Sequence, residues 1–195
     1  MKSKLLSSRN RIHLQLHDYT QKIALNNSSQ KVRILYKNPD KPLLLWVDGG
    51  ILDFCCSDAG KYLDHYTDIF VVAYWQPELK AFNSVNQVLK CLFNISHKLK
   101  SQFFMNKIYL LGHSFGTLFT LPAVKMYPKL YYSYLAVGQY INLLKNYQAF
   151  HKEILKNLNN KYSISAYILK KYETVTYKNL CQYDRFIRIN GLLNA

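Results

Sequence analysis

Acidic residues are scarce in this chain of 195 residues, which carries 11 Asp and Glu against 26 Lys and Arg, a formal net charge of +15. The lysines are scattered, and the few arginines form no stripe that would read nucleic acid. We therefore expect no specific nucleic-acid partner and no membrane partner. An apolar fraction of 49% excludes an intrinsically disordered chain despite the charge.

Long hydrophobic runs are also missing. The longest, Leu43 to Val47, is the length of a strand and far too short to span a bilayer. Arg9 and Arg11 interrupt the basic N-terminal stretch, so we expect no signal peptide. The four cysteines form no CxxC pair, which argues against a zinc site. We expect no metal, no cofactor, and buried thiols in a reducing cytoplasm.

Several segments have the pattern of β-strands. Two short ones at 21–26 and 31–36, separated by a polar turn, predict a hairpin. Segments that are almost continuously apolar predict strands covered on both faces, as in a mostly parallel sheet. These segments are 43–47, 69–74, 107–111 and 130–137.

Helical periodicity separates these strands. Apolar residues recur every three or four positions over 83–102, with Asn83 or Ser84 as the N-cap, and a shorter helix at 118–126 contains Pro122. The alternation of strand and helix predicts an α/β fold. Beyond Gly138 only helical patterns follow, at 141–158 and 164–172. We therefore expect a core at 1–139 and a helical appendage at 140–195.

The sequence Gly112-His113-Ser114-Phe115-Gly116 matches the pattern GxSxG between a predicted strand and a predicted helix. This setting is typical of a nucleophile elbow, in which a sharp turn presents the serine hydroxyl at the edge of the sheet. Ser114 is therefore the candidate nucleophile. The backbone N–H of Phe115, at the helix N-terminus, would donate to an oxyanion. The alternative interpretation is an ordinary glycine turn with a buried serine.

A second glycine pair follows the strand 43–47, in the sequence Asp48-Gly49-Gly50. Backbone N–H groups of such a loop supply the other oxyanion donor in α/β hydrolases. Gly49 and Gly50 are thus candidate donors. An ordinary turn between a strand and a helix would have the same composition.

These segments resemble the proline iminopeptidase-like α/β hydrolases. Residues 43–50 are similar to the strand and HGGPG loop of that family, and 70–75 to the strand before its DQRGxGxS motif. KIYLLGHSFGT, residues 107–117, is close to the family's KIYLLGHSWGS. YYSYLAVGQ, residues 131–139, resembles the stretch after the elbow helix, and residues 140–195 resemble the start of a helical cap. The resemblance implies an α/β-hydrolase fold and serine hydrolase chemistry.

The sequence differs from the family pattern at the motifs that carry the family's catalytic residues. Asp48 stands in place of the His of HGGPG, Ile51-Leu52 in place of its Pro-Gly, and the DQRGxGxS motif is missing after Trp75. The triad order of this fold is Ser, then Asp or Glu, then His. After Ser114 the only histidine is His151, and no acid lies between the two. The other histidines, at 13, 17, 65, 97 and 113, are more typical of surface or core positions than of a base.

We therefore expect an α/β-hydrolase fold that is incomplete at its C-terminus and ends inside the cap. The first hypothesis is a serine hydrolase, aminopeptidase-like, that would act on a small molecule or peptide but is weak or inactive because the triad acid and His are missing. The second is a non-catalytic remnant that binds a partner through its basic surface. The third is a split enzyme completed by another chain. An unpaired sheet edge would favour association.

Overall fold

The computed structural model describes residues 15–25, 28–49 and 62–157, together with residues 169, 170, 172, 174–176, 179, 182 and 183. The chain forms two compact units, residues 1–139 and residues 140–195. That the second unit is the start of a cap remains a prediction.

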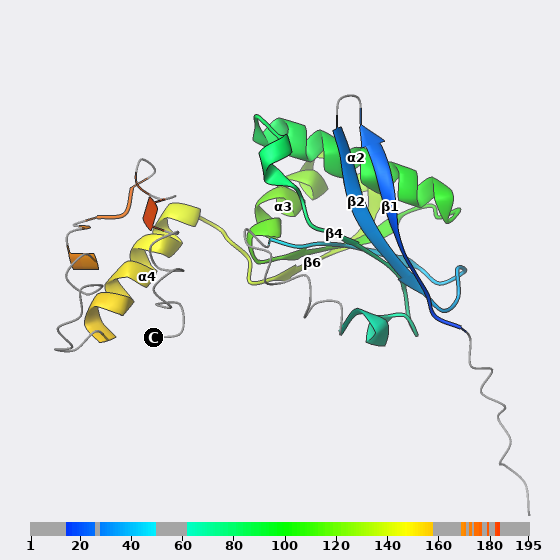
Figure 1. Cartoon of the computed structure of the whole chain (residues 1–195), viewed down its shortest axis with the longest axis horizontal. Coiled ribbons are helices and arrows are strands. Elements are labelled where there is room, and N and C mark those ends of the chain that lie inside the picture. Colours follow the sequence, from blue (N-terminus) through cyan, green and yellow to red (C-terminus); the bar gives the residue numbers. More distant parts are fainter. Residues whose placement is uncertain are drawn as a thin grey trace, which may run out of the picture. The chain divides into compact units, whose positions relative to one another are not determined.

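The first unit is built on a six-stranded sheet with the order β1-β2-β4-β3-β5-β6 (Figure 1). β1 and β2 form an antiparallel hairpin, and β2 also pairs antiparallel with β4. The pairs β3–β4, β3–β5 and β5–β6 are parallel. This confirms the expected α/β class with a mostly parallel sheet and an N-terminal hairpin. The strands are β1 (His17–Leu25), β2 (Ser28–Tyr36), β3 (Leu43–Val47), β4 (Val71–Trp75), β5 (Ile108–His113) and β6 (Tyr131–Val137).

Several strand boundaries differ from the prediction: the hairpin strands expected at 21–26 and 31–36 run over 17–25 and 28–36, and β6 begins one residue later than expected. Two further differences have local reasons. The strand expected at 69–74 runs instead from Val71 to Trp75, because the N–H groups of Ile69 and Phe70 both donate to the Tyr66 carbonyl and close a helical turn. The strand expected at 107–111 continues to His113, which remains in register with Val137 of β6. This extension brings β5 directly to Ser114.

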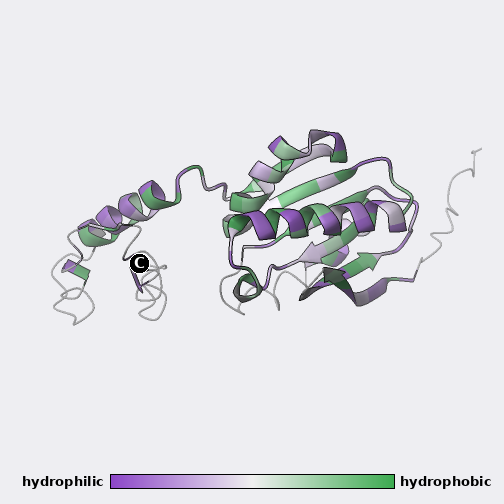
Figure 2. Ribbon diagram, turned by 90° about the horizontal axis from the view of Figure 1, so that it is seen from above, coloured by the Kyte–Doolittle hydropathy of each residue, from purple (hydrophilic) through white to green (hydrophobic). Residues whose placement is uncertain are grey.

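Helices α2 (Val85–Gln102) and α3 (Thr117–Met126) cover one face of the sheet (Figure 1). Ser84 is the N-cap of α2, since its hydroxyl accepts from the Gln87 N–H at 3.4 Å. Hydrophobic and hydrophilic residues separate onto opposite sides of α2 (Figure 2). The buried side packs on the sheet and includes Val88, Leu92, Ile95 and Leu99.

A short helical segment at 62–66 covers part of the other face, where Leu63 packs with Leu35 and Val72. Three 3₁₀ turns complete the described part of this unit: η1 (Leu79–Ala81), η2 (Ser114–Gly116) and η3 (Pro128–Leu130). Among the described residues, no helix combines the length and the apolar character needed to cross a membrane.

Phe104, two residues after the last residue of α2, has a strained backbone conformation. It follows the C-cap Phe103 with a φ of +54°, and its side chain is 96% exposed. Its N–H donates to Ser101 O, and the next N–H, of Met105, donates to Lys100 O at 2.8 Å. Helices commonly end with a left-handed residue at this position, but glycine occupies it without a Cβ clash.

We expect Phe104→Gly to raise the free energy of unfolding by about 1 kcal/mol, because glycine relieves the left-handed strain and no buried contact is lost. Urea denaturation of the whole chain measures this change. Phe104→Ala is the control, since it removes the ring but keeps the strain. A gain of equal size in Phe104→Ala would contradict the explanation.

The second unit contains α4 (Leu143–Asn157), close to the helix expected at 141–158. Most of the second expected helix, 164–172, lies outside the described residues. A buried cluster joins α4 to Leu169, Val175 and Tyr183. His151 is buried within it, with Nδ1 3.1 Å from the Tyr183 hydroxyl and the two rings edge to face. Desolvation lowers the pKa of His151, opposed in part by a backbone hydrogen bond to Tyr172.

This unit should lose stability on acidification. Because the pKa of His151 is lower when folded than its ordinary value of 6.5, the unfolded form binds more protons near that pH. The contribution is complete above pH 6.5 and is lost as the pH falls through the folded pKa. Hydrogen exchange of α4 amides in the full chain, at pH 7.5 and 5.5, should show this loss. His151→Phe should abolish the difference, and His97→Gln, on the exposed side of α2, should leave it intact.

Candidate active site

The turn that carries Ser114 lies between β5 and α3. Ser114 begins the 3₁₀ turn η2 with a φ of +51°, one of two positive φ values at non-glycine positions among the described residues. A serine in the left-handed region costs on the order of 1 kcal/mol and persists only where the surroundings hold it. Strand, strained turn and helix follow one another, which is the arrangement that a nucleophile elbow requires.

Three glycines allow this turn to pack tightly. A Cβ on Gly49 would overlap the backbone nitrogens of Phe115 and Gly116, and a Cβ on Gly116 would overlap the Val47 carbonyl oxygen at the end of β3. A Cβ on Gly112 would overlap the Thr120 hydroxyl of α3. The backbone just after β3 and the turn after β5 are therefore in direct contact. Only glycine fits at these positions, because any larger residue would place a Cβ atom inside a neighbouring group.

Two threonine hydroxyls hold the turn from the helix side. Thr117 Oγ1 donates to the Ser114 carbonyl at 2.6 Å, and Thr120 Oγ1 lies 3.1 Å from the Gly116 carbonyl. The Tyr134 hydroxyl of β6 lies 3.2 Å from Thr120 Oγ1 and donates to Gln139 Oε1 at 2.7 Å. These bonds tie η2 to α3 and β6.

Of the three backbone N–H groups expected as donors to an oxyanion, the structure describes those of Phe115 and Gly49. Phe115 N lies in the 3₁₀ turn η2, which runs directly into α3, in contact with Gly49. The Gly49 N–H, however, donates to Asp48 Oδ1 at 2.7 Å, so it is already used within the loop. Gly50, the other expected donor, lies outside the described residues. Gly49 thus has a packing contact with the turn, and the donor role of Gly50 remains a prediction.

Asp48 is the centre of a buried polar network at the end of β3. Its side chain is 2% exposed, and besides the Gly49 N–H it accepts from the Tyr74 hydroxyl of β4. His113 Nδ1 of β5 lies 2.9 Å from Asp48 Oδ1. The network joins the ends of three adjacent strands, and its His113 is the residue immediately before Ser114.

Sequence reasoning missed this Asp48–His113 pair. Asp48 ends β3 and His113 ends β5, and the two strands are neighbours in the sheet with Val47 opposite Gly112. The available signal was the position of both residues at the carboxyl ends of predicted parallel strands, which meet at one edge of a sheet. His113 Nδ1 is turned to Asp48, and its ring packs edge to face on Trp46.

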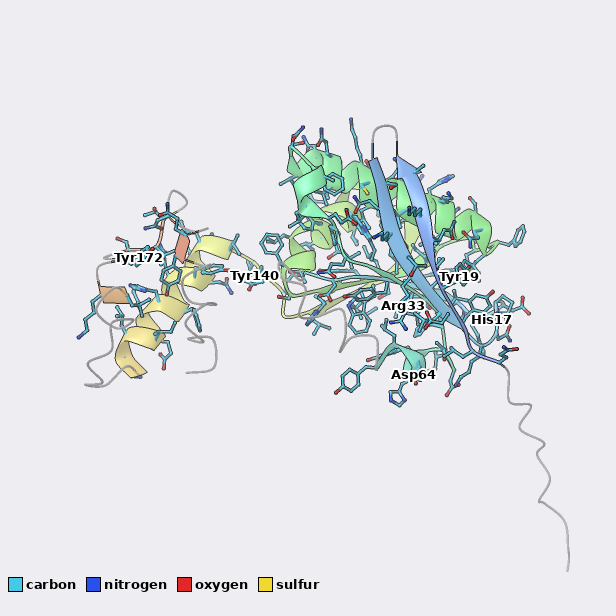
Figure 3. All side chains as sticks on the ribbon, viewed as in Figure 1. His17, Tyr19, Arg33, Asp64, Tyr140 and Tyr172 are labelled. Carbon is cyan, nitrogen blue, oxygen red and sulfur yellow. The ribbon has the colours of Figure 1, made fainter. Side chains whose placement is uncertain are left out.

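Each of the other described histidines of the first unit lies on a different element from the turn. His17, labelled in Figure 3 with Tyr19 and Arg33, is on β1 and stacks on Tyr36. β1 is four strands from β5, a separation of about 19 Å across the sheet. His65 is exposed beside Asp64, and His97 is exposed on α2. His13 lies outside the described residues.

Comparisons with known proteins agree with this architecture. No protein-family model matches the chain. A Bacillus subtilis (strain 168) protein named "Probable aminopeptidase YbaC" is 24% identical over an alignment of 130 residues that covers 62% of this chain and 41% of that protein. The chain thus spans about two fifths of the length of this curated relative.

Solved structures match at lower identity. The proline iminopeptidase-related protein of Thermus thermophilus matches with a TM-score of 0.53 and 13% identity, over 90% of this chain and 67% of that one. An E-2-(acetamidomethylene)succinate hydrolase matches with a TM-score of 0.53 and 15% identity, over 80% and 59%. The fold of this chain is therefore that of the α/β hydrolases, present in part relative to these longer chains.

The close contact between the two loops is testable by adding one methyl group. Gly116→Ala should lower the free energy of unfolding by about 3 kcal/mol, because its Cβ would meet backbone on β3 that cannot move aside. Gly138→Ala is a matched control. Gly138 has a φ of +63°, but a Cβ there would find its nearest neighbour at 3.8 Å, so about 1 kcal/mol is expected. Equal losses in urea denaturation would contradict the packing argument.

Proposed function

We propose that the chain is a serine hydrolase module of the aminopeptidase-like type, with Ser114 as its nucleophile, and that it is weakly active or inactive by itself. The observation that carries the proposal is the left-handed φ of Ser114 in a turn held between β5 and α3. A strained serine in a strand–turn–helix setting has no structural advantage over glycine there, and strain of this kind is typical of functional sites.

The chemistry proposed is acyl transfer, in which the Ser114 Oγ bonds to the substrate carbonyl carbon, the amide or ester bond breaks, and the leaving amine or alcohol takes the proton that the hydroxyl loses; water then releases the acyl group as the acid. The oxyanion formed on the substrate carbonyl would accept from the Phe115 N–H at the start of the elbow helix. The proposed substrate is a small molecule or peptide with an amide or ester bond. The peptidase assignment is supported by the name of the Bacillus subtilis relative and is the finer part of the proposal.

The proposed low activity follows from the missing base. A serine hydroxyl is a poor nucleophile at its free pKa unless a base takes its proton. His151, the only histidine after Ser114, is buried in the second unit against Tyr183. His113 is paired through Nδ1 with Asp48, which follows β3. Neither is in the chain order that this fold uses for its triad.

Labelling with a fluorophosphonate probe tests the nucleophile. We expect slow modification of a single residue, lost in Ser114→Ala and retained in Ser133→Ala, which alters an exposed serine on β6. Peptide mapping of the adduct identifies the site. Labelling that persists in Ser114→Ala would show that Ser114 is not the nucleophile.

The same preparation tests the low activity. Turnover of aminoacyl p-nitroanilides should be at least about 10⁴-fold below that of the intact Bacillus subtilis relative, as expected when triad members are absent. A kcat comparable to that of the relative would contradict the proposed low activity. If that activity were lost in Ser114→Ala, the result would still support Ser114 as the nucleophile.

A further inference from the structure

β1 is the edge strand of the sheet on the side of the hairpin, and its side chains are exposed. Among the described strands it pairs only with β2 (Figure 1). The side chains from Gln15 to Thr20 are all exposed, as are those of Lys22 and Ala24. Alternate N–H and C=O groups of an edge strand point away from the sheet and can pair with another strand. The side chains of β1 then decide which strand can pair there.

The side chains of β1 alternate between the two faces of the sheet. Ile23 packs in the same core cluster as the buried side of α2, and Gln102 of α2 donates to the Tyr19 hydroxyl at 3.2 Å, so these odd-numbered positions face α2. The other face carries a row of exposed residues, which in order are Leu16, Asp18, Thr20, Lys22 and Ala24. The row is complementary to its own reverse, because it runs from apolar to acidic, hydroxyl, basic and apolar again.

The two charges of this row are unevenly balanced within the chain. Lys22 lies directly opposite Lys31 of β2, and like charges in this position destabilise a sheet. β2 contains no acidic residue. Asp18 is held by Arg33 through hydrogen bonds of 2.9 and 2.6 Å, yet its side chain remains 37% exposed. The row thus presents a carboxylate in a fixed position and, four residues along, a lysine without an acidic neighbour on β2.

We propose that two copies of this chain associate through their β1 edges, as antiparallel strands related by a two-fold axis at Thr20, to form one continuous sheet. In this register Asp18 of each copy lies opposite Lys22 of the other, and Leu16 lies opposite Ala24. Thr20 lies opposite its own counterpart, which is a favourable cross-strand pair. The interface uses the same surface on both copies and closes after two.

Other antiparallel registers lose this match. Opposite residues must share a face of the sheet, so a two-fold pair can shift only in steps of two residues. A shift of two leaves Asp18 and Lys22 opposite uncharged residues. A shift of four places Asp18 opposite its own counterpart or Lys22 opposite its own. The charges that disfavour other strands therefore select a single register for a second copy.

The net charge of +15 opposes association at long range. At 0.15 M salt, however, charges separated by more than about 8 Å are largely screened. Opposite side chains on neighbouring strands have Cβ atoms about 5 Å apart, well inside this range. An acidic strand from another protein would match Lys22 but repel Asp18, and a basic strand would do the reverse. A second copy of this chain matches both.

Sedimentation equilibrium of the full chain at 0.15 M salt tests the association. We expect a dimer that Asp18→Lys and Lys22→Asp each weaken at least tenfold, because each change places like charges opposite one another. An equimolar mixture of the two variants should restore the dimer, since the new lysine then lies opposite the new aspartate and the two unchanged residues still face each other. Asp40→Lys and Lys90→Asp are the matched controls at exposed positions outside β1, and both should associate as the parent does.

A cysteine at the two-fold axis tests the register directly. Opposite residues of antiparallel strands have Cα atoms about 4.5–5.5 Å apart, which is within the range of a disulfide. Thr20→Cys should therefore form a cross-linked dimer under mild oxidation. Ala24→Cys is the control, because its two copies would be about 27 Å apart along the strands. Both variants keep the four cysteines of the parent, so a difference between them comes from the added thiol.

Several results would overturn the proposal. These are a monomeric parent at millimolar concentration, equal association of the parent and the two charge variants, or no recovery in their mixture. Cross-linking of Ala24→Cys as fast as that of Thr20→Cys would contradict the two-fold register. Circular dichroism checks that each variant is folded, and Lys22→Asp leaves the Asp18–Arg33 contact in place, so its effect does not depend on losing that contact.

Discussion

The direct backbone contact between the end of β3 and the turn after β5 is the constraint on which the described site depends. Parallel pairing of β3 and β5 brings Val47 opposite Gly112. The backbone segments that follow the two strands then lie so close together that neither Gly49 nor Gly116 can carry a side chain. The turn that carries Ser114 is packed against the end of β3 at Gly116 and against α3 at Gly112. The position of the serine thus follows from main-chain packing, which is hard to alter by single side-chain changes elsewhere.

The Asp48 network adds a second constraint to the same place. Its carboxylate joins β3, β4 and β5 through Tyr74 and His113, and it also engages the N–H of the following glycine. An aspartate at this point therefore ties the end of β3 to both neighbouring strands and engages the Gly49 N–H, which is then not free to face a substrate.

Much of the architecture could be predicted from local pattern. Residues 43–47 are apolar at every position because β3 is covered on both faces, and the strand has those bounds. Ser84 was one of two candidate caps and is the one used. The candidate site was only partly predictable, because the Asp48–His113 contact depends on β5 lying beside β3. Hydrophobic periodicity predicts which segments form strands, but it does not predict the order of those strands in the sheet. The strained conformation of Phe104 carried no sequence signal, since glycine or asparagine usually occupies such positions.

The excess of lysine and arginine over acidic residues bears on how the chain behaves in solution. Repulsion between molecules of net charge +15 keeps them apart, and this repulsion acts over about 10 Å at 0.1 M salt but only about 3 Å at 1 M. Colloidal stability should therefore fall, rather than rise, with ionic strength. Dilute buffers of low salt would keep such a chain dispersed, and the salt washes common in purification would weaken the repulsion that separates its molecules.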